Sequence, residues 1–212
     1  MNQNRKLVRV PPPYVDRGRQ FGLDLVAHYA AGGSPRSRAR SGDRGTESNP
    51  IRQAHGKIGE AAVAIYFGLD VETAIKWEVG FADRGTDITL ANGVRLDVKT
   101  TLPLFNLCWS RTINDLYWQK EFDALVSVSI EEKDWSCCHV EGWITKGGFY
   151  HHKQISNGVN PRLERGTWFV RKRILSNIDD LPYLPILPAC ERTVIPWSIR
   201  HVAGANDLIF AA

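Results

Sequence analysis

The chain has 212 residues, of which 43% are hydrophobic and 10% aromatic. This apolar content is enough to fill the core of one α/β domain, so it excludes wholesale disorder. The longest nearly apolar stretch, residues 61–69, is far shorter than the roughly 20 residues of a membrane span, and the N-terminus lacks the apolar segment of a signal peptide. These observations predict a soluble, cytoplasmic protein without a membrane partner.

The net charge of +4 is unevenly distributed along the chain. Residues 1–52 carry ten Lys and Arg against four Asp and Glu, whereas the remaining residues carry 17 against 19. A basic arm beside a nearly neutral globule is typical of polyanion binding, although many basic tails only improve solubility. We expect residues 1–49 to form this arm and residues 182–212, which contain four prolines, to wrap over the core as irregular chain.

Little regular structure is expected within the arm. Residues 1–20 contain three consecutive prolines, which favour polyproline II over helix and predict an extended or loose segment. Residues 21–31 carry apolar residues at helical spacing and predict a short helix. Residues 32–49 are rich in Gly, Ser and Arg, and we interpret them as a flexible linker.

A core domain is expected over residues 50–181. Apolar residues recur every three or four positions at its start, as in a helix packed on a sheet, and the turn pair Asn92-Gly93 joins two short alternating stretches into a hairpin. The elements predicted in chain order are a helix at 51–69, strands at 71–80, 87–90 and 94–101, a loop at 102–111, strands at 122–130, 140–145 and 167–170, and a helix at 172–181.

The strand at 94–101 carries a carboxylate and an ammonium side by side. Apolar residues alternate with Asp97 and Lys99 along it, so these two side chains lie on one face, two residues apart. A D-x-K pair by itself is readily explained as the solvated face of an amphipathic strand.

Two further carboxylates are expected near Asp97. The hairpin turn brings Asp87 back within a couple of registers of Asp97, and two carboxylates that close are tolerated when a divalent cation bridges them. Glu60 lies on the preceding helix between two small residues, which allow that helix to approach the sheet. The predicted convergence comprises Glu60, Asp87, Asp97 and Lys99.

At these residues the sequence resembles the PD-(D/E)XK phosphodiesterase superfamily, the restriction-endonuclease-like nucleases. The matching motifs are G-K-I-G-E at 56–60, G-T-D-I at 85–88 and D-V-K-T at 97–100. Each motif is short and common, but their joint occurrence in this order on suitable elements is more specific. Two positions depart from the usual pattern, since Asp97 stands where Glu is commoner and Thr86 stands where Pro is commoner.

The resemblance covers roughly residues 50–145 and implies a restriction-endonuclease-like α/β fold, with a mixed central sheet flanked by helices. It implies Mg²⁺-dependent hydrolysis of a phosphodiester bond in DNA, with Mn²⁺ as a substitute and no small-molecule cofactor. The metal ligands would be Asp87, Asp97, the carbonyl of Val98 and, through water, Glu60. Lys99 would orient or help deprotonate the attacking water, and the products would carry a 5′-phosphate and a 3′-hydroxyl.

Two groups of basic residues are the candidate DNA contacts: Arg36, Arg38 and Arg40 in the arm, and Arg162, Arg165, Arg171, Lys172 and Arg173 near the C-terminal end of the core. The second group, with Trp168 and Phe169 interleaved, suits phosphate contact with some base stacking, and a solvated strand edge explains it nearly as well. Gln119 and Lys120 are better explained as a helix surface pair than as contacts to the scissile strand.

The mode of cutting is open. A stand-alone endonuclease, selective for DNA structure or encoded by a phage or defence system, is our first expectation. An exonuclease and a site-specific restriction-type enzyme are alternatives. A catalytically idle nucleic-acid-binding module on the same fold and a structural protein with an ion-pair network are alternatives of other classes. Homodimers are common where both strands are cut, and the sequence leaves the oligomeric state open.

Overall fold

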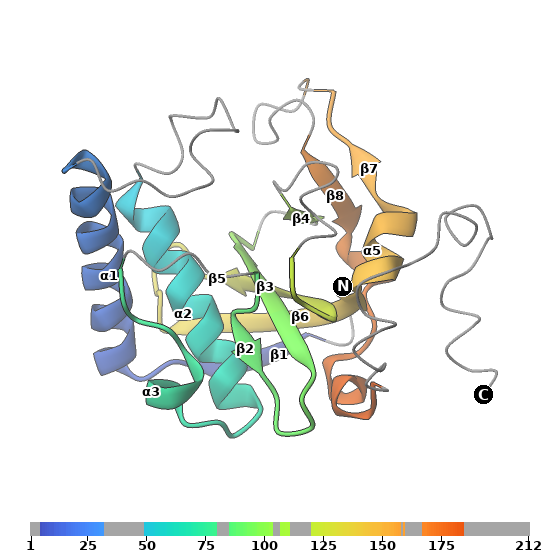
Figure 1. Cartoon of the computed structure of the whole chain (residues 1–212), viewed down its shortest axis with the longest axis horizontal. Coiled ribbons are helices and arrows are strands. Elements are labelled where there is room, and N and C mark those ends of the chain that lie inside the picture. Colours follow the sequence, from blue (N-terminus) through green and yellow to red (C-terminus); the bar gives the residue numbers. More distant parts are fainter. Residues whose placement is uncertain are drawn as a thin grey trace.

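The computed structural model describes residues 5–31, 49–79, 85–103, 107–110, 120–157, 159 and 167–184, with the backbone alone for 107–110. The strands are β1 (Lys6–Arg9), β2 (Ile88–Thr89), β3 (Arg95–Thr101), β4 (Leu107–Ser110), β5 (Ala124–Ile130), β6 (Cys137–Thr145), β7 (Gln154–Ile155) and β8 (Trp168–Arg171). The helices are α1 (Pro12–Ala30), α2 (Pro50–Tyr66), α3 (Val71–Ala74), α5 (Lys146–His152) and the 3₁₀ turns η1 (Lys172–Ile174) and η2 (Ile178–Tyr183) (Figure 1).

A mixed sheet of five strands organises the molecule. Its strand order is β1-β6-β5-β3-β2. β3 and β5 run parallel, with Asp97 opposite Leu125, and the other neighbouring pairs are antiparallel. The connection between the parallel strands β3 and β5 includes β4, which belongs to a second sheet of order β4-β8-β7. The protein is therefore a mixed α/β structure, as the sequence predicts.

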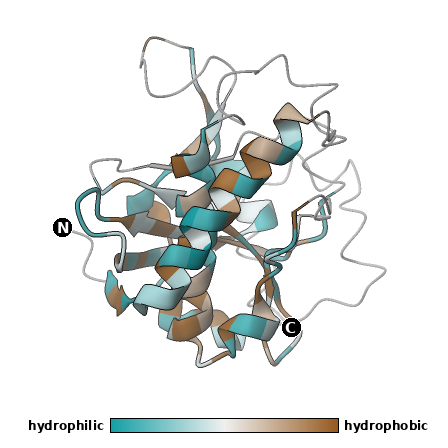
Figure 2. Cartoon of the chain, turned by 90° about the vertical axis from the view of Figure 1, so that its left-hand side faces the viewer, coloured by the Kyte–Doolittle hydropathy of each residue, from teal (hydrophilic) through white to brown (hydrophobic). Residues whose placement is uncertain are grey.

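One face of the five-stranded sheet is covered by α2, and α1 packs outside α2. Ile58 of α2 is fully buried in one apolar core with Leu96 and Val98 of β3, and burial of each such side chain contributes about 1.5–3 kcal/mol. Gly59 brings the helix backbone very close to the sheet, because a Cβ there would lie 1.9 Å from Thr100 Oγ1. Figure 2 views the molecule from the side of α1 and shows this helix as the outer layer, with many hydrophilic residues.

A second, smaller core lies on the other face of the sheet. Leu125 of β5 and Ile144 of β6 pack there with Phe149 of α5 and Trp168 of β8. The small sheet and α5 therefore cover part of the face opposite α2 (Figure 1). Among the described residues, no helix is both long enough and apolar enough to cross a membrane.

Several predicted elements are confirmed. The helix expected at 51–69 is α2, which begins after Asn49, whose side-chain oxygen accepts hydrogen bonds from the backbone N–H groups of Ile51 and Arg52. The hairpin expected at 87–101 is β2 and β3, and the strands expected at 122–130, 140–145 and 167–170 are β5, β6 and β8.

The prediction for residues 1–20 was wrong. Residues 6–9 form the edge strand β1, paired with β6, and α1 begins at Pro12 rather than near residue 21. Proline is compatible with the first turn of a helix, because the N–H groups there have no intrahelical partner and the fixed φ is already helical. Consecutive prolines therefore mark the start of α1 instead of excluding a helix.

Three other predictions were also wrong in part. The strand expected at 71–80 is wrong: residues 71–74 form the short helix α3, because the Asp70 carboxylate accepts from Glu72 N–H at 3.1 Å and starts a turn, and residues 75–79 form no strand. The loop expected at 102–111 includes β4. The helix expected at 172–181 is split into η1 and η2, because Ser176 forms a bridge with Trp143 through two backbone hydrogen bonds of 2.8 and 3.1 Å.

The division into a basic arm at 1–49, a core at 50–181 and a wrap at 182–212 stays a prediction. Within the first of these segments, β1 joins the central sheet and α1 packs on α2. Residues 32–48 of the expected linker and 185–212 of the expected wrap lie outside the described residues.

Candidate metal and phosphodiester site

Asp97 and Lys99 lie on the face of β3 opposite α2. Thr100 contacts α2 at Gly59, so alternation along the strand directs Asp97 and Lys99 to the other face. The Asp97 side chain is only 2% exposed, and its Oδ1 accepts a hydrogen bond from Lys99 Nζ. A buried carboxylate is thus held by the lysine two residues further along the same strand.

Asp87 is held directly beside Asp97. The Asp87 N–H donates to Leu96 O at 2.8 Å, and its carboxylate accepts from Val98 N–H at 2.7 Å. Leu96 and Val98 flank Asp97, so Asp87 is bonded on both sides of that residue. The antiparallel register of β2 and β3, with Ile88 opposite Leu96, produces this placement as the turn pair predicts.

The loop before Asp87 packs against the segment that enters β5. Gly85 has φ +94°, and a Cβ there would lie 2.7 Å from Lys120 Cβ, so only glycine suits both the backbone conformation and the space. Thr86 Oγ1 donates to the carbonyl of Glu121. The Gly85-Thr86-Asp87 segment and residues 120–121 are therefore fixed against each other.

Two more lysines belong to this neighbourhood. Lys120 Nζ lies 3.9 Å from Asp97 Oδ2, an oxygen that is buried and accepts no hydrogen bond from the described residues. Lys146, the first residue of α5, donates from Nζ to the carbonyl of Lys120. Burial lowers the pKa of Lys146 to about 8.

The sequence predicted that Gln119 and Lys120 form a surface pair on a helix. Lys120 is not part of a helix, so this prediction was wrong for Lys120, and Gln119 lies outside the described residues.

Lys146 was missed in the sequence. It directly follows an apolar strand, and neither hydrophobic periodicity nor motif spacing distinguishes it from an ordinary polar residue at a strand end. Its link to the site comes from the start of α5 lying at the beginning of β5, where Lys146 N–H donates to Asp123 O at 2.9 Å.

Glu60 occupies a different environment. It lies on α2, is 7% exposed, and accepts from Lys57 Nζ at 2.6 Å. Within the part of the chain that is described, no three His, Cys, Asp or Glu side chains form a group that could hold a metal ion. The structure thus brings together Asp87, Asp97 and Lys99, and the water-mediated role of Glu60 stays a prediction.

The two aspartates fit a hard divalent cation. Such a cation takes oxygen ligands, and the buried Asp97 Oδ2 lacks a hydrogen-bond donor from the described residues while the Asp87 carboxylate lies alongside. An unsatisfied buried carboxylate oxygen is unfavourable by itself, and coordination of a cation removes that cost.

The predicted DNA contacts fall into three groups. Arg36, Arg38, Arg40, Arg162 and Arg165 lie outside the described residues. Arg171 and Arg173 are exposed on either side of η1's first residue. Lys172 differs from the expectation, because its side chain is 4% exposed and its Nζ donates to Glu141 Oε1 at 3.2 Å. It therefore neutralises a buried carboxylate instead of extending to the surface.

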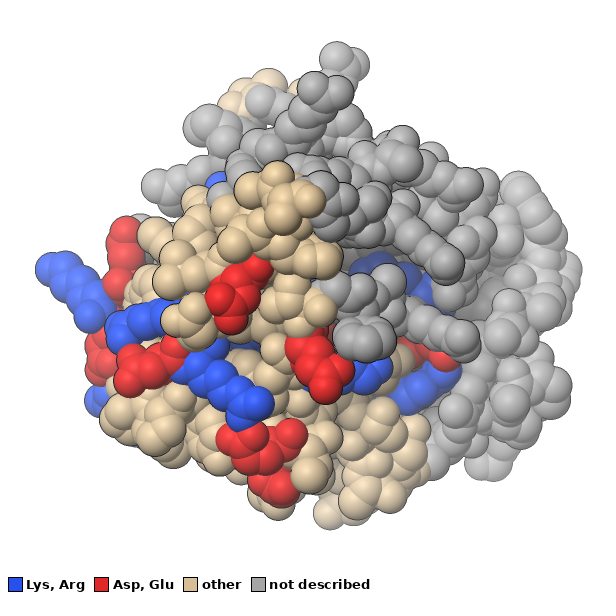
Figure 3. All heavy atoms as spheres, turned by 60° about the vertical axis from the view of Figure 1, so that its left-hand side comes forward, with Lys and Arg blue, Asp and Glu red and all other residues tan. Residues whose placement is uncertain are grey.

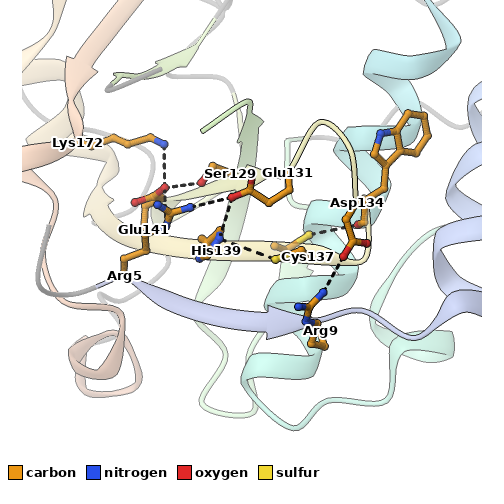
Figure 4. Close-up of polar contacts among 11 residues, drawn as sticks. Arg5, Arg9, Ser129, Glu131, Asp134, Cys137, His139, Glu141 and Lys172 are labelled. Carbon is orange, nitrogen blue, oxygen red and sulfur yellow. Dashed lines mark hydrogen bonds and ion pairs between the residues drawn. The ribbon is translucent and has the colours of Figure 1, made fainter. Parts of the chain in front are cut away.

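Glu141 anchors a polar network next to β1 (Figure 4). Ser129 Oγ donates to Glu141, and Arg5 Nε lies 3.7 Å from Glu141 Oε1. Arg5 also pairs with Glu131, whose Oε1 lies 3.2 Å from His139 Nε2. Sequence patterns gave no sign of this network, because Arg5 and Lys172 come from segments far from β5 and β6 in the chain.

The basic residues near the N-terminus are engaged in ion pairs. Lys6 pairs with Asp179 at 2.6 Å, Arg9 with Asp134 at 2.7 Å, and Arg17 with Glu72. Figure 3 shows Lys and Arg interspersed with Asp and Glu on the described part of the surface that it views. The positive charge at the start of the chain is thus balanced locally within the described residues.

Comparison of the chain with models of protein families found no match, and comparison with curated proteins found none either.

Proposed function

We propose that the protein is a divalent-cation-dependent DNA nuclease with a restriction-endonuclease-like fold. The observation that carries this proposal is the pairing of Asp87 with a buried Asp97 across one hairpin, with Lys99 bonded to Asp97 on the same face. The succession of α2, the β2–β3 hairpin and the parallel strand β5 supports the fold assignment.

Each residue would have a distinct role. Asp87, Asp97 and the Val98 carbonyl would hold Mg²⁺, with Mn²⁺ as a substitute. The ion would supply a water of lowered pKa and neutralise charge on the phosphate. Lys99, which is bonded to Asp97 Oδ1, would orient the attacking water and offset negative charge at phosphorus. Arg171 and Arg173 would contact the DNA backbone from the surface.

The test is cleavage of supercoiled plasmid, linear duplex, single strand and four-way junction in Mg²⁺, Mn²⁺ or EDTA. We expect cation-dependent cutting, reduced by at least about 100-fold in Lys99→Ala and in the nearly isosteric Asp97→Asn. The affinity of Lys99→Ala for DNA, measured in EDTA so that no cutting occurs, should differ little from that of the wild type, because Lys99 contacts only the reacting phosphate and not the rest of the DNA backbone. The preferred substrate distinguishes an endonuclease from the exonuclease and restriction-type alternatives.

Lys133→Ala is the matched control, since Lys133 is exposed and lies on the turn between β5 and β6. Cleavage that survives Lys99→Ala would overturn the catalytic assignment. Tight DNA binding with no cutting of any substrate would favour the idle binding module, and the absence of both would favour the structural ion-pair network.

A further inference from the structure

A second lysine faces the carboxylate at the centre of the candidate site. Lys99 is bonded to Asp97 Oδ1, whereas Lys120 Nζ lies 3.9 Å from Asp97 Oδ2. That separation is an ion-pair distance but too long for a hydrogen bond, so the Lys120 ammonium lies near the site without a hydrogen bond to Asp97. Its side chain is 28% exposed, which leaves it accessible to a bound molecule.

The backbone of Lys120 is held in place from two directions. Its side-chain stem crosses Gly85, where any Cβ would overlap Lys120 Cβ and Cγ at 2.7 and 2.8 Å. On the other side, Lys146 Nζ donates to the Lys120 carbonyl. The stem therefore leaves a fixed point beside the Gly85-Thr86-Asp87 loop, and the rotatable part of the side chain lies toward Asp97.

We propose that Lys120 is a second phosphate-contacting residue of this site, binding a non-bridging oxygen of the phosphodiester. The inference rests on the proposed nuclease function. A phosphodiester beside Asp87 and Asp97 would lie within reach of the Lys120 side chain, and a lysine ammonium on a flexible stem suits contact with a phosphate oxygen. The Lys146 ammonium, which donates to the Lys120 carbonyl, holds the backbone of Lys120 in this arrangement.

The experiment compares single-turnover cleavage by the wild type, Lys120→Met, Lys120→Arg and the exposed control Lys133→Met in the full chain. We expect Lys120→Met to lower the rate on the order of 10- to 100-fold, with Lys120→Arg restoring most of it and Lys133→Met unchanged. Thermal unfolding of each variant checks that the loss is not a loss of fold.

A Mn²⁺ titration without DNA gives a readout that does not depend on cleavage. A positive charge beside the aspartates repels a cation, so Lys120→Met should bind Mn²⁺ about threefold to tenfold more tightly than Lys133→Met. This readout reports whether the Lys120 ammonium lies close to the cation site, as the inference requires. Equal Mn²⁺ affinity in the two variants would contradict the inference.

The outcomes separate this inference from the proposed function. If Lys99→Ala stops cleavage and Lys120→Met cleaves at the wild-type rate, the role of Lys120 is overturned and the nuclease proposal stands. If Lys120→Arg is as slow as Lys120→Met in a folded protein, charge at this position is not the cause and the role is overturned as well. If the wild type cleaves no substrate, both proposals fall.

Discussion

Two buried carboxylates of the central sheet are balanced in different ways. Asp97 has one oxygen bonded to Lys99 and another without a donor from the described residues, whereas Glu141 Oε1 receives Ser129 Oγ and Lys172 Nζ. A closed network suits a structural role, and a carboxylate with spare coordination capacity suits a ligand role. This difference separates the candidate metal site from the nearby Glu141 network.

Removal of Lys172 should destabilise the protein strongly. Lys172→Met leaves Glu141, which is 5% exposed, with less compensation for its charge, and we expect a loss of about 2–4 kcal/mol in the free energy of unfolding. The neighbouring Arg173→Met removes the same charge from an exposed side chain and should change stability by less than about 0.5 kcal/mol. Urea denaturation measures both. Equal losses in the two variants would contradict the structural role of Lys172.

For single residues, the sequence identified those of the hairpin but not the lysines that distant segments place near its carboxylates or those of β6. Asp87, Asp97 and Lys99 were found because alternation and a turn pair are local signals. Lys120 and Lys172 were misjudged, because burial and distance from a carboxylate depend on the packing of residues far apart in the chain.

Among the elements, α2 is the helix that packs against β3, on the face opposite Asp97 and Lys99. Its closest approach to the strand is at Gly59, against Thr100. The apolar period of α2 was visible in the sequence, but the distance between helix and strand was not. The two glycines of the G-K-I-G-E motif therefore differ in their packing: Gly59 lies against β3, whereas a Cβ at Gly56 would meet no atom within 4 Å.

The two glycines of α2 should respond in opposite directions to alanine. Gly59→Ala places a methyl group 1.9 Å from Thr100 Oγ1, so the helix or the strand must move, at a cost of about 1–3 kcal/mol. Gly56→Ala meets no atom within 4 Å and should stabilise the helix by about 0.5–1 kcal/mol. Thermal unfolding compares the two, and a stabilised Gly59→Ala would show that α2 does not lie this close to β3.

In the molecule as a whole, the side chain of Trp135 links α1 and α2 to the central sheet. Trp135, in the connection between β5 and β6, meets the His55 ring of α2 edge-on at 4.5 Å and lies under the Arg19 guanidinium of α1 at 4.9 Å. Burial lowers the pKa of His55 to about 4, and its Nε2 is buried without a hydrogen-bond partner among the described residues. Protonation of His55 therefore opposes the packing of these layers.

The stability of the fold should fall in mild acid for this reason. Between pH 6.5 and about 4 the unfolded chain binds a proton at His55 that the folded protein does not, so the free energy of unfolding decreases as pH falls through this window. We expect His55→Leu to reduce that decrease by on the order of 1–2 kcal/mol, allowing for partial solvent screening. His152→Leu, on the exposed end of α5, is the control, and parallel pH profiles for the wild type and His55→Leu would contradict the argument.

Features that depend on residues close together in the chain could be predicted from the sequence. The periodicity of residues 51–69, the Asn92-Gly93 turn and the alternation through Asp97 and Lys99 sufficed to predict α2, the hairpin and the position of Asp87, because each is a local preference of the backbone. Three features became visible only in the folded protein: β1 pairs with β6, β3 runs parallel to β5, and Lys120 lies against Gly85. These contacts join distant segments, and their energies depend on burial and shape, which no short window of sequence contains.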